Sequence, residues 1–133
     1  MKKLLLLMAF IMPFLLTSCG DDKDDNKDFN YPLETLYGTW QITHFSAELT
    51  STFYTWDEEK TTATFQKNGK YYGEGYLGTG EGTYTAIGDR ITTYVNGEIY
   101  LIYDVVSLDH TTAVLKLYTK EQTAYMYIKC IKI

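Results

Sequence analysis

The chain is poor in the residues that most often build a catalytic or metal centre. Its 133 residues include two histidines and two cysteines. His44 and His110 lie far apart in the sequence, and neither has a second histidine at the spacing of metal ligands. No serine is accompanied by a base, and no two carboxylates stand out as an acid and base pair. We therefore expect no metal site, no cofactor and no enzymatic activity. An enzyme would need a polar cluster that the sequence does not reveal.

An excess of positive charge is also lacking, and this removes one class of partner. From Tyr31 onward the chain has 8 Lys+Arg against 12 Asp+Glu, which leaves a net charge of -4. Nucleic-acid binding depends on a basic surface that neutralises phosphates. Nucleic acid is therefore not an expected partner.

No apolar run is long enough for a membrane-spanning helix. The run at residues 4–16 is about 13 residues long, against the roughly 20 that such a helix needs. It follows Met1-Lys2-Lys3 and precedes small residues, a pattern typical of a secretory signal peptide, here residues 1–18. The cysteine that comes next, Cys19, decides what kind of signal peptide this is.

Leu16-Thr17-Ser18-Cys19 resembles the lipobox of bacterial lipoproteins at all four positions. The resemblance implies that Cys19 is joined to diacylglycerol and becomes the first residue after cleavage. Acyl chains such as palmitate would then anchor the protein to a membrane, because two or three chains hold far more firmly than one. The alternative is a plain secreted protein with an incidental cysteine near its cleavage site.

Residues 19–30 are predicted to form a lipidated acidic tether. Residues 20–28 contain five Asp and two Lys and no apolar side chain, so they cannot bury surface to offset chain entropy. A calcium loop of the EF-hand type would need a glycine and a distal glutamate that are missing here. The acidic run resembles the surface-export signal of Bacteroidetes lipoproteins. It favours a location in the cell envelope on the outer membrane, and leaves open whether the folded part faces outward or the periplasm.

Residues 31–133 are enough for one small domain, and their pattern is that of successive strands. Turn signals at Asn68-Gly69, Gly88-Asp89 and Asn96-Gly97 separate strand-like runs. Short connections make neighbouring strands antiparallel, and eight of them can close into an up-and-down barrel. Segment 47–60 is either a long loop at the barrel mouth or contains a ninth short strand at 52–56. The eight predicted strands are 38–46, 61–66, 70–76, 82–87, 90–95, 98–106, 112–119 and 123–131.

Alternation along these strands predicts which side chains face the core. Ala124, Met126, Ile128 and Cys130 share one face of the last strand. Cys130 has no second cysteine to pair with and is expected to be a small buried hydrophobe. The strand at 98–106 is apolar on both faces, which predicts that the N-terminal segment or a partner covers its outer side.

The start of the first strand, Leu36-Tyr37-Gly38-Thr39-Trp40, resembles the Gly-x-Trp start of lipocalins. Thr61-Ala63-Phe65 and Gly82-Thr83-Tyr84-Thr85 are similar to the strand pattern of bacterial lipocalin-like lipoproteins. The resemblance implies an all-β, lipocalin-like barrel in which Trp40 plugs one end. Many lipocalins place an Arg on the last strand across that Trp, but this chain has only Lys129 and Lys132 there. The secreted-lipocalin motif of the middle strands is also absent.

Two functions follow from this fold. In the first, the barrel binds a small hydrophobic or amphipathic ligand. Trp40 would then point inward, alternation would send Ile42 and His44 inward with it, and Phe53, Tyr54 and Trp56 would contact the ligand at the mouth. In the second, the barrel is filled and acts through its surface on a glycan or a protein. Oligomeric state is open in both.

One further motif is a formal match without its context. The residues at 73–78 satisfy G-x-G-x-x-G, but that motif cradles a pyrophosphate only between a strand and a helix. Strands flank it here, so we expect these glycines to bend strands at a barrel corner.

Overall fold

The computed structural model describes residues 28–121 and 124–133. The predicted signal peptide, the lipidated Cys19 and most of the tether lie outside these residues and stay predictions. Among the residues that are described, no helix has the length and apolar character needed to cross a membrane.

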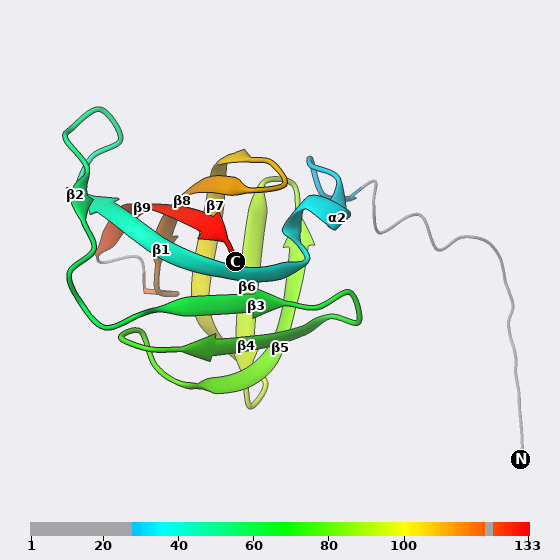
Figure 1. Cartoon of the computed structure of the whole chain (residues 1–133). Coiled ribbons are helices and arrows are strands. Elements are labelled where there is room, and N and C mark those ends of the chain that lie inside the picture. Colours follow the sequence, from blue (N-terminus) through cyan, green and yellow to red (C-terminus); the bar gives the residue numbers. More distant parts are fainter. Residues whose placement is uncertain (1–27, 122–123) are drawn as a thin grey trace, which may run out of the picture.

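The predicted eight-stranded antiparallel barrel is confirmed. Neighbouring strands pair in chain order from β3 to β9, β1 pairs with β3, and the ladder between β1 and β9 closes the barrel (Figure 1). One short helix precedes the first strand in the described part. The elements are α2 Leu33–Leu36, β1 Gly38–Ser46, β2 Tyr54–Thr55, β3 Thr62–Phe65, β4 Lys70–Glu74, β5 Gly80–Ile87, β6 Arg90–Val95, β7 Glu98–Leu108, β8 Thr112–Tyr118 and β9 Tyr125–Lys132.

The uncertain segment at 47–60 contains both of its predicted alternatives. Tyr54 and Thr55 form the two-residue strand β2, which pairs with β1 at Phe45 and His44. The rest of the segment forms loops at the end of the barrel to which β1 runs (Figure 1). β1 thus pairs with β3 along its first half and with β2 near its end.

Two of the predicted hairpin turns show why Asn-Gly is such a strong signal. Asn96 and Gly97 both have positive φ, 56° and 82°, as a two-residue turn with the twist of the flanking strands requires. At the other turn only Gly69 has positive φ, and the Lys70 N–H donates to Asn68 Oδ1 at 3.0 Å. Both turns connect antiparallel neighbours as predicted.

The inward direction predicted for His44 is wrong, because β1 contains a β-bulge. The register between β1 and β9 shifts between Ile42 and His44. An extra residue in one strand reverses the alternation beyond it. His44 therefore lies opposite Lys129, on the outer face, while Phe45 lies opposite the fully buried Ile128 and packs against the core.

The chain packs onto the barrel a few residues before α2. Phe29, which the sequence placed in the tether, is buried in the core cluster and forms a parallel bridge with Gly88. The Asn30 N–H donates to the Gly88 carbonyl at 2.7 Å, and the Gly88 N–H donates to the Asp28 carbonyl. The N-terminal segment is thus attached beside the turn between β5 and β6.

The outer side of β7 was predicted to be covered by the N-terminal segment or by a partner, and in the described residues it is only partly buried. On that outer face Ile102 is buried and lies directly opposite the buried Tyr118 of β8. Tyr100 and Val106 on the same face remain exposed. A neighbouring strand of the same sheet therefore supplies the side chain opposite Ile102.

Candidate ligand-binding cavity

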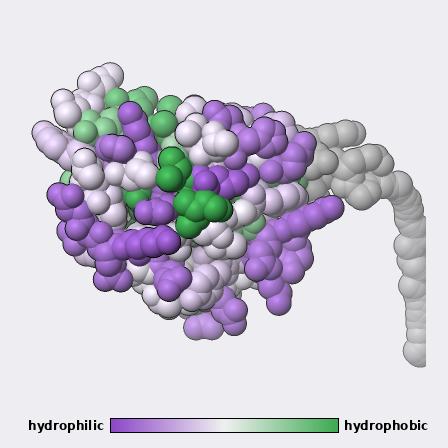
Figure 2. All heavy atoms as spheres, in the orientation of Figure 1, coloured by the Kyte–Doolittle hydropathy of each residue, from purple (hydrophilic) through white to green (hydrophobic). Residues whose placement is uncertain are grey.

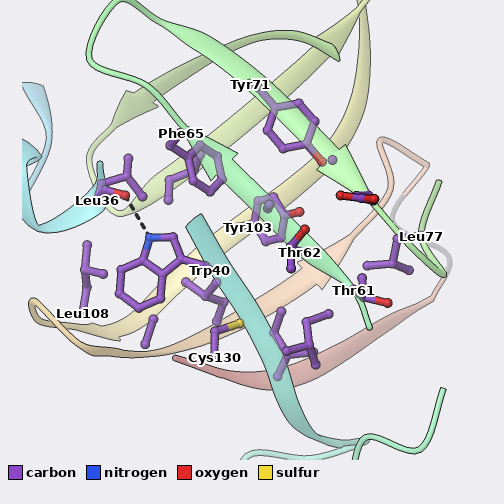
Figure 3. A pocket seen from close by; sticks show the side chains of 18 of the residues that line it. Leu36, Trp40, Thr61, Thr62, Phe65, Tyr71, Leu77, Tyr103, Leu108 and Cys130 are labelled. Carbon is purple, nitrogen blue, oxygen red and sulfur yellow. Dashed lines mark hydrogen bonds between the residues drawn. The ribbon is translucent and has the colours of Figure 1, made fainter. Parts of the chain in front are cut away.

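An elongated internal cavity lies inside the barrel, between two differently built ends. It contains about 30 Å³ that the centre of a water molecule can occupy. Leu36, Trp40 and Leu108 line it at one end and Leu77 at the other (Figure 3). Glu74 and Gly78, which flank Leu77 in the sequence, line it as well. The wall between them is mostly apolar and comes from the inward faces of seven strands: Ile42, Ala63, Phe65, Tyr71, Ile91, Tyr103, Ala113, Leu115, Ile128 and Cys130.

Trp40 closes the first end. Its ring is buried, and its indole Nε1–H donates to the Leu36 carbonyl at 2.8 Å (Figure 3). Lys132 lies across from Trp40 on β9, with Nζ 5.1 Å from the ring centre and donating to the Thr35 carbonyl at 2.9 Å. The lysine thus occupies the place where many lipocalins have arginine. We call the end containing Trp40 the closed end.

A short loop, residues 75–79, covers the opposite end, which we call the mouth. The Leu77 side chain lines the cavity from this loop. The Tyr76 N–H donates to Thr61 Oγ1 at 3.0 Å, and the Tyr100 hydroxyl donates to the Leu77 carbonyl. Gly78 has φ +112°, and a Cβ there would lie 2.0 Å from the Tyr100 hydroxyl oxygen. Only glycine fits under this contact, so we call residues 75–79 the lid and the Tyr100 hydrogen bond its latch.

A second space of about 150 Å³, measured in the same way, adjoins the mouth. Its walls include Tyr71, Gly73 and Gly78, which also line the internal cavity. Gly73 lies directly opposite Gly80, so no side chain from this pair fills the space. The glycine run that formally matched a nucleotide motif therefore thins the barrel wall, with Tyr71 at the boundary of both spaces. We call the second space the side cavity.

Two tyrosine hydroxyls are the main polar groups deep in the cavity. Tyr71 of β4 and Tyr103 of β7 are each 4% exposed, and both side chains line the cavity, where their phenol groups interact electrostatically (Figure 3). Burial raises the pKa of Tyr71 and raises that of Tyr103 well above the usual value, so both stay protonated at neutral pH. Apart from each other, these hydroxyls have no hydrogen-bond partner among the described residues.

Aromatic rings form a row at the rim of the mouth. Tyr54 and Phe45 have ring centres 6.1 Å apart, Phe45 and Trp56 5.8 Å, and Trp56 and Tyr76 5.6 Å. The two outer members are well exposed, Tyr54 by 62% and Tyr76 by 58%. We call these four rings the rim row.

The six residues predicted to contact a ligand do not come together. Trp40 and Ile42 line the cavity, whereas His44 lies outside it, with Nδ1 2.9 Å from Thr43 Oγ1. Phe53 faces the Lys129 ammonium group, whose Nζ is 4.5 Å from its ring centre. Tyr54 and Trp56 belong to the rim row and do not line the cavity.

The sequence did not predict that Tyr71, Tyr103 and Leu77 line the cavity. The glycine run was the available signal, because glycines inside strands often mark a close approach by a ligand or by another part of the chain. Nothing local in the sequence pairs Tyr71 with Tyr103, since their contact depends on the closure of the barrel.

The two ends differ in charge. At the mouth, which comprises the loops there and the last two residues of each strand, the described basic residues are Lys60 and Lys120. Eight carboxylates accompany them: Glu48, Asp57, Glu58, Glu59, Glu74, Glu81, Glu98 and Glu121. At the closed end, defined in the same way from residue 28, the signs balance: Asp28, Glu34, Asp89 and Asp109 against Lys67, Lys70, Arg90 and Lys132.

The described part of the chain contains one buried free thiol and no cluster of candidate metal ligands. Cys130 is buried in the cavity wall, and burial raises the pKa of its thiol to about 12, so it is not a thiolate at neutral pH. Residues 28–121 and 124–133 contain no group of three or more His, Cys, Asp or Glu side chains that could hold a metal ion.

A closed eight-stranded antiparallel barrel whose end is plugged by the tryptophan of a Gly-x-Trp start defines a lipocalin-like protein. The chain belongs to the lipocalin-like domain family, whose model matches residues 36–115. No curated protein matches the chain. Among solved structures it is similar to a selenomethionine derivative of a biogenic amine-binding protein. The identity is 12% and the TM-score 0.36, over 80% of this chain and 67% of that one.

Proposed function

We propose that the protein is a lipid-anchored lipocalin-like lipoprotein that binds a small apolar or amphipathic molecule inside its barrel. The observation that carries this proposal is an apolar cavity that contains a pair of tyrosine hydroxyls with no other partner. Binding sites for small molecules typically combine mostly apolar walls with a few placed polar groups. No catalytic step is part of the proposal.

The size of the cavity sets a condition on binding. A volume of 30 Å³ holds about two water molecules, since one needs roughly 10–15 Å³ on this measure. A larger ligand must therefore displace the Leu77 side chain or use the side cavity beyond Tyr71. The lid is suited to such movement because it is short, lies at the surface, and is attached to the barrel through few hydrogen bonds.

Native mass spectrometry of the full chain, purified from the envelope of the cell that makes it, tests ligand binding directly. We expect a reproducible added mass that organic extraction removes. Protein that consistently shows only its own mass, and that gains none when incubated with an envelope lipid extract, would contradict the carrier function.

The membrane anchor is proposed from the resemblance of Leu16-Thr17-Ser18-Cys19 to a lipobox. The acidic tether that follows Cys19 favours the outer membrane as its location. The Cys19→Ala variant should lose incorporation of an alkyne-labelled palmitate and leave the membrane fraction. Cys130→Ala is the matched control, because it removes the other cysteine and should keep both properties. Membrane association and lipid labelling that persist in Cys19→Ala would overturn the lipoprotein assignment.

Export to the cell surface is proposed on the acidic run alone. Replacing Asp21, Asp22, Asp24 and Asp25 by Ala should reduce digestion of the protein by a protease added outside intact cells. If the protease digested this variant as fast as the unaltered chain, the acidic run would not direct export.

A second candidate function rests on the rim row. Exposed Tyr54 and Tyr76 present ring faces on which a sugar ring can stack. On the face shown in Figure 2, hydrophobic surface occurs only in small patches between hydrophilic regions, which offers little to an apolar protein interface. Glycan-array binding that disappears in Tyr54→Ala with Tyr76→Ala, and persists in Tyr125→Ala on β9, would favour this candidate. Equal glycan binding by the double variant, by Tyr125→Ala and by the unaltered chain would remove the support for this candidate.

A further inference from the structure

We propose that the paired hydroxyls of Tyr71 and Tyr103 are the polar recognition site of the cavity, and that they select a ligand with an uncharged hydrogen-bond acceptor, such as a ketone, ester or alcohol. This inference rests on the proposed carrier function and adds the chemical class of the ligand. It uses three features of the molecule: the hydrogen-bonding capacity of the pair, the lack of a counter-charge around it, and the charge of the mouth.

The first feature is an unused hydrogen-bond donor. Each hydroxyl has one proton to donate, and a hydrogen bond between the two could use only one of them. The other proton has no acceptor among the described residues, although both rings are 4% exposed. A buried donor without a partner loses its hydration with no replacement, which is a measurable cost to the folded chain. An acceptor on a ligand recovers that loss.

The position of the pair makes this donor available to a bound molecule. Tyr71 lines both the internal cavity and the side cavity. Its hydroxyl oxygen lies over Gly73, 2.6 Å from where a Cβ would be, so any larger residue there would press on the hydroxyl. Gly73 thus keeps open the space beside the hydroxyl, next to the thinned part of the wall.

The second feature is the absence of a cation at this depth. Within residues 28–121 and 124–133, no Lys, Arg or His side chain lines the internal cavity. A carboxylate or phosphate brought beside the tyrosines would lose its hydration and gain no opposite charge, which is strongly unfavourable in an apolar environment. An uncharged acceptor avoids this penalty.

The third feature acts before the ligand enters. The mouth contains eight carboxylates and two lysines among its described residues. A rim of one sign lowers the local concentration of ligands of the same sign. Anionic lipids are therefore disfavoured at the mouth as well as beside the tyrosine pair. Glu74, which lines the cavity at its mouth, would instead attract a cationic ligand to the rim, away from the pair.

The test compares ligands with one chain length and different end groups. The mature chain, residues 19–133, is used with Cys19→Ala so that neither lipid nor detergent competes for the cavity. We expect titration followed by NMR to show 2-octanone and 1-octanol shifting the amide signal of Gly73. Octanoate should bind at least about tenfold more weakly.

The decisive variant is Tyr71→Phe with Tyr103→Phe, which keeps both rings and removes both hydroxyls. It should fold at least as well as the unaltered chain, because removing both members of an incompletely bonded pair leaves no orphaned polar group. Its affinity for 2-octanone should fall about three- to tenfold, the effect of one hydrogen bond. Tyr72→Phe, on the same strand with its ring on the opposite face, is the control and should leave affinity unchanged.

Three outcomes would overturn the inference. An affinity for 2-octanone in the double variant within twofold of the unaltered value would show that the hydroxyls are not used. Octanoate binding as tightly as 2-octanone would contradict the selection for an uncharged group. Tightest binding by octylammonium, lost in Glu74→Gln, would place recognition at the rim. In all three cases the carrier function survives, whereas the failure of every eight-carbon ligand to bind would contradict that function as well.

Discussion

The two ends of the barrel differ in their side chains and their charges. We expect the closed end to stabilise the fold and the mouth to admit the ligand. At the closed end, large apolar side chains fill the space, and Trp40 is held through its indole N–H and by Lys132 across the barrel. At the mouth, glycines replace side chains, the lid depends on a tyrosine hydroxyl, and the charges are mostly negative. We therefore expect the closed end to contribute more to the stability of the barrel, and the mouth to open more readily.

The largest expected effect comes from removing one tryptophan from each end. Trp40→Ala should lower the free energy of unfolding by about 3–5 kcal/mol, because it leaves a cavity in a filled region. Trp56→Ala should cost less than about 2 kcal/mol, since that ring is only half-buried in the rim row. Urea denaturation followed by circular dichroism measures both. Equal losses would show that the mouth is packed as firmly as the closed end.

A smaller effect is expected from alkaline pH. Burial raises the pKa of Tyr103 well above 10 and that of Tyr84 to about 12, whereas the unfolded chain ionises its tyrosines near pH 10. The stabilisation is therefore fully present below pH 10 and is lost as pH rises above it, at up to about 1.4 kcal/mol per pH unit for the buried Tyr103 and less for the half-buried Tyr84.

Unfolding free energies measured between pH 9 and 12 test this expectation. The Tyr103→Phe variant should show a shallower decline, because one buried phenol no longer contributes to it. A decline of the same slope in both chains would show that the ionisation of Tyr103 does not control stability in this range.

The smallest effect should be confined to the mouth. Tyr100→Phe removes the latch and should cost about 0.5–1.5 kcal/mol, the net value of one hydrogen bond. Hydrogen exchange at the Leu77 and Gly78 amides should become faster, while exchange at the Trp40 indole stays the same. Faster exchange at both ends would mean that the lid and the closed end unfold as one unit.

Much of this barrel is predictable from local sequence because its connections are local. Asn96-Gly97 and Gly88-Asp89 lie between consecutive strands, so turn chemistry alone determines which strands pair. On the predicted core face of β9, Ile128 and Cys130 are buried, Met126 is partly buried, and Ala124, which lies just before the strand, is exposed. Trp40 was predictable for the same reason, since it lies on β1 before any irregularity.

The prediction for His44 was wrong because the local sequence does not determine where a β-bulge forms. A β-bulge depends on how two distant strands, β1 and β9, fit when the barrel closes, and no residue near His44 announces it. The same is true of the Tyr71–Tyr103 pair and of the Tyr100 latch, which join strands that are not neighbours in the barrel or a strand to a distant loop. The closed end was visible in the sequence, while most of the candidate site was not.

The bridge between Phe29 and Gly88 has a consequence for how the molecule stands on a membrane. It attaches the incoming chain at the closed end, so a lipid on Cys19 would pull on the barrel from that side. The part of the tether between Cys19 and Asp28, residues 20–27, can span at most about 30 Å when fully extended. Drawn taut, it would present Trp40 to the bilayer and direct the lid toward the space beyond. Cargo would then be exchanged with whatever lies opposite the membrane, and the leaflet that holds the anchor would not be its immediate source.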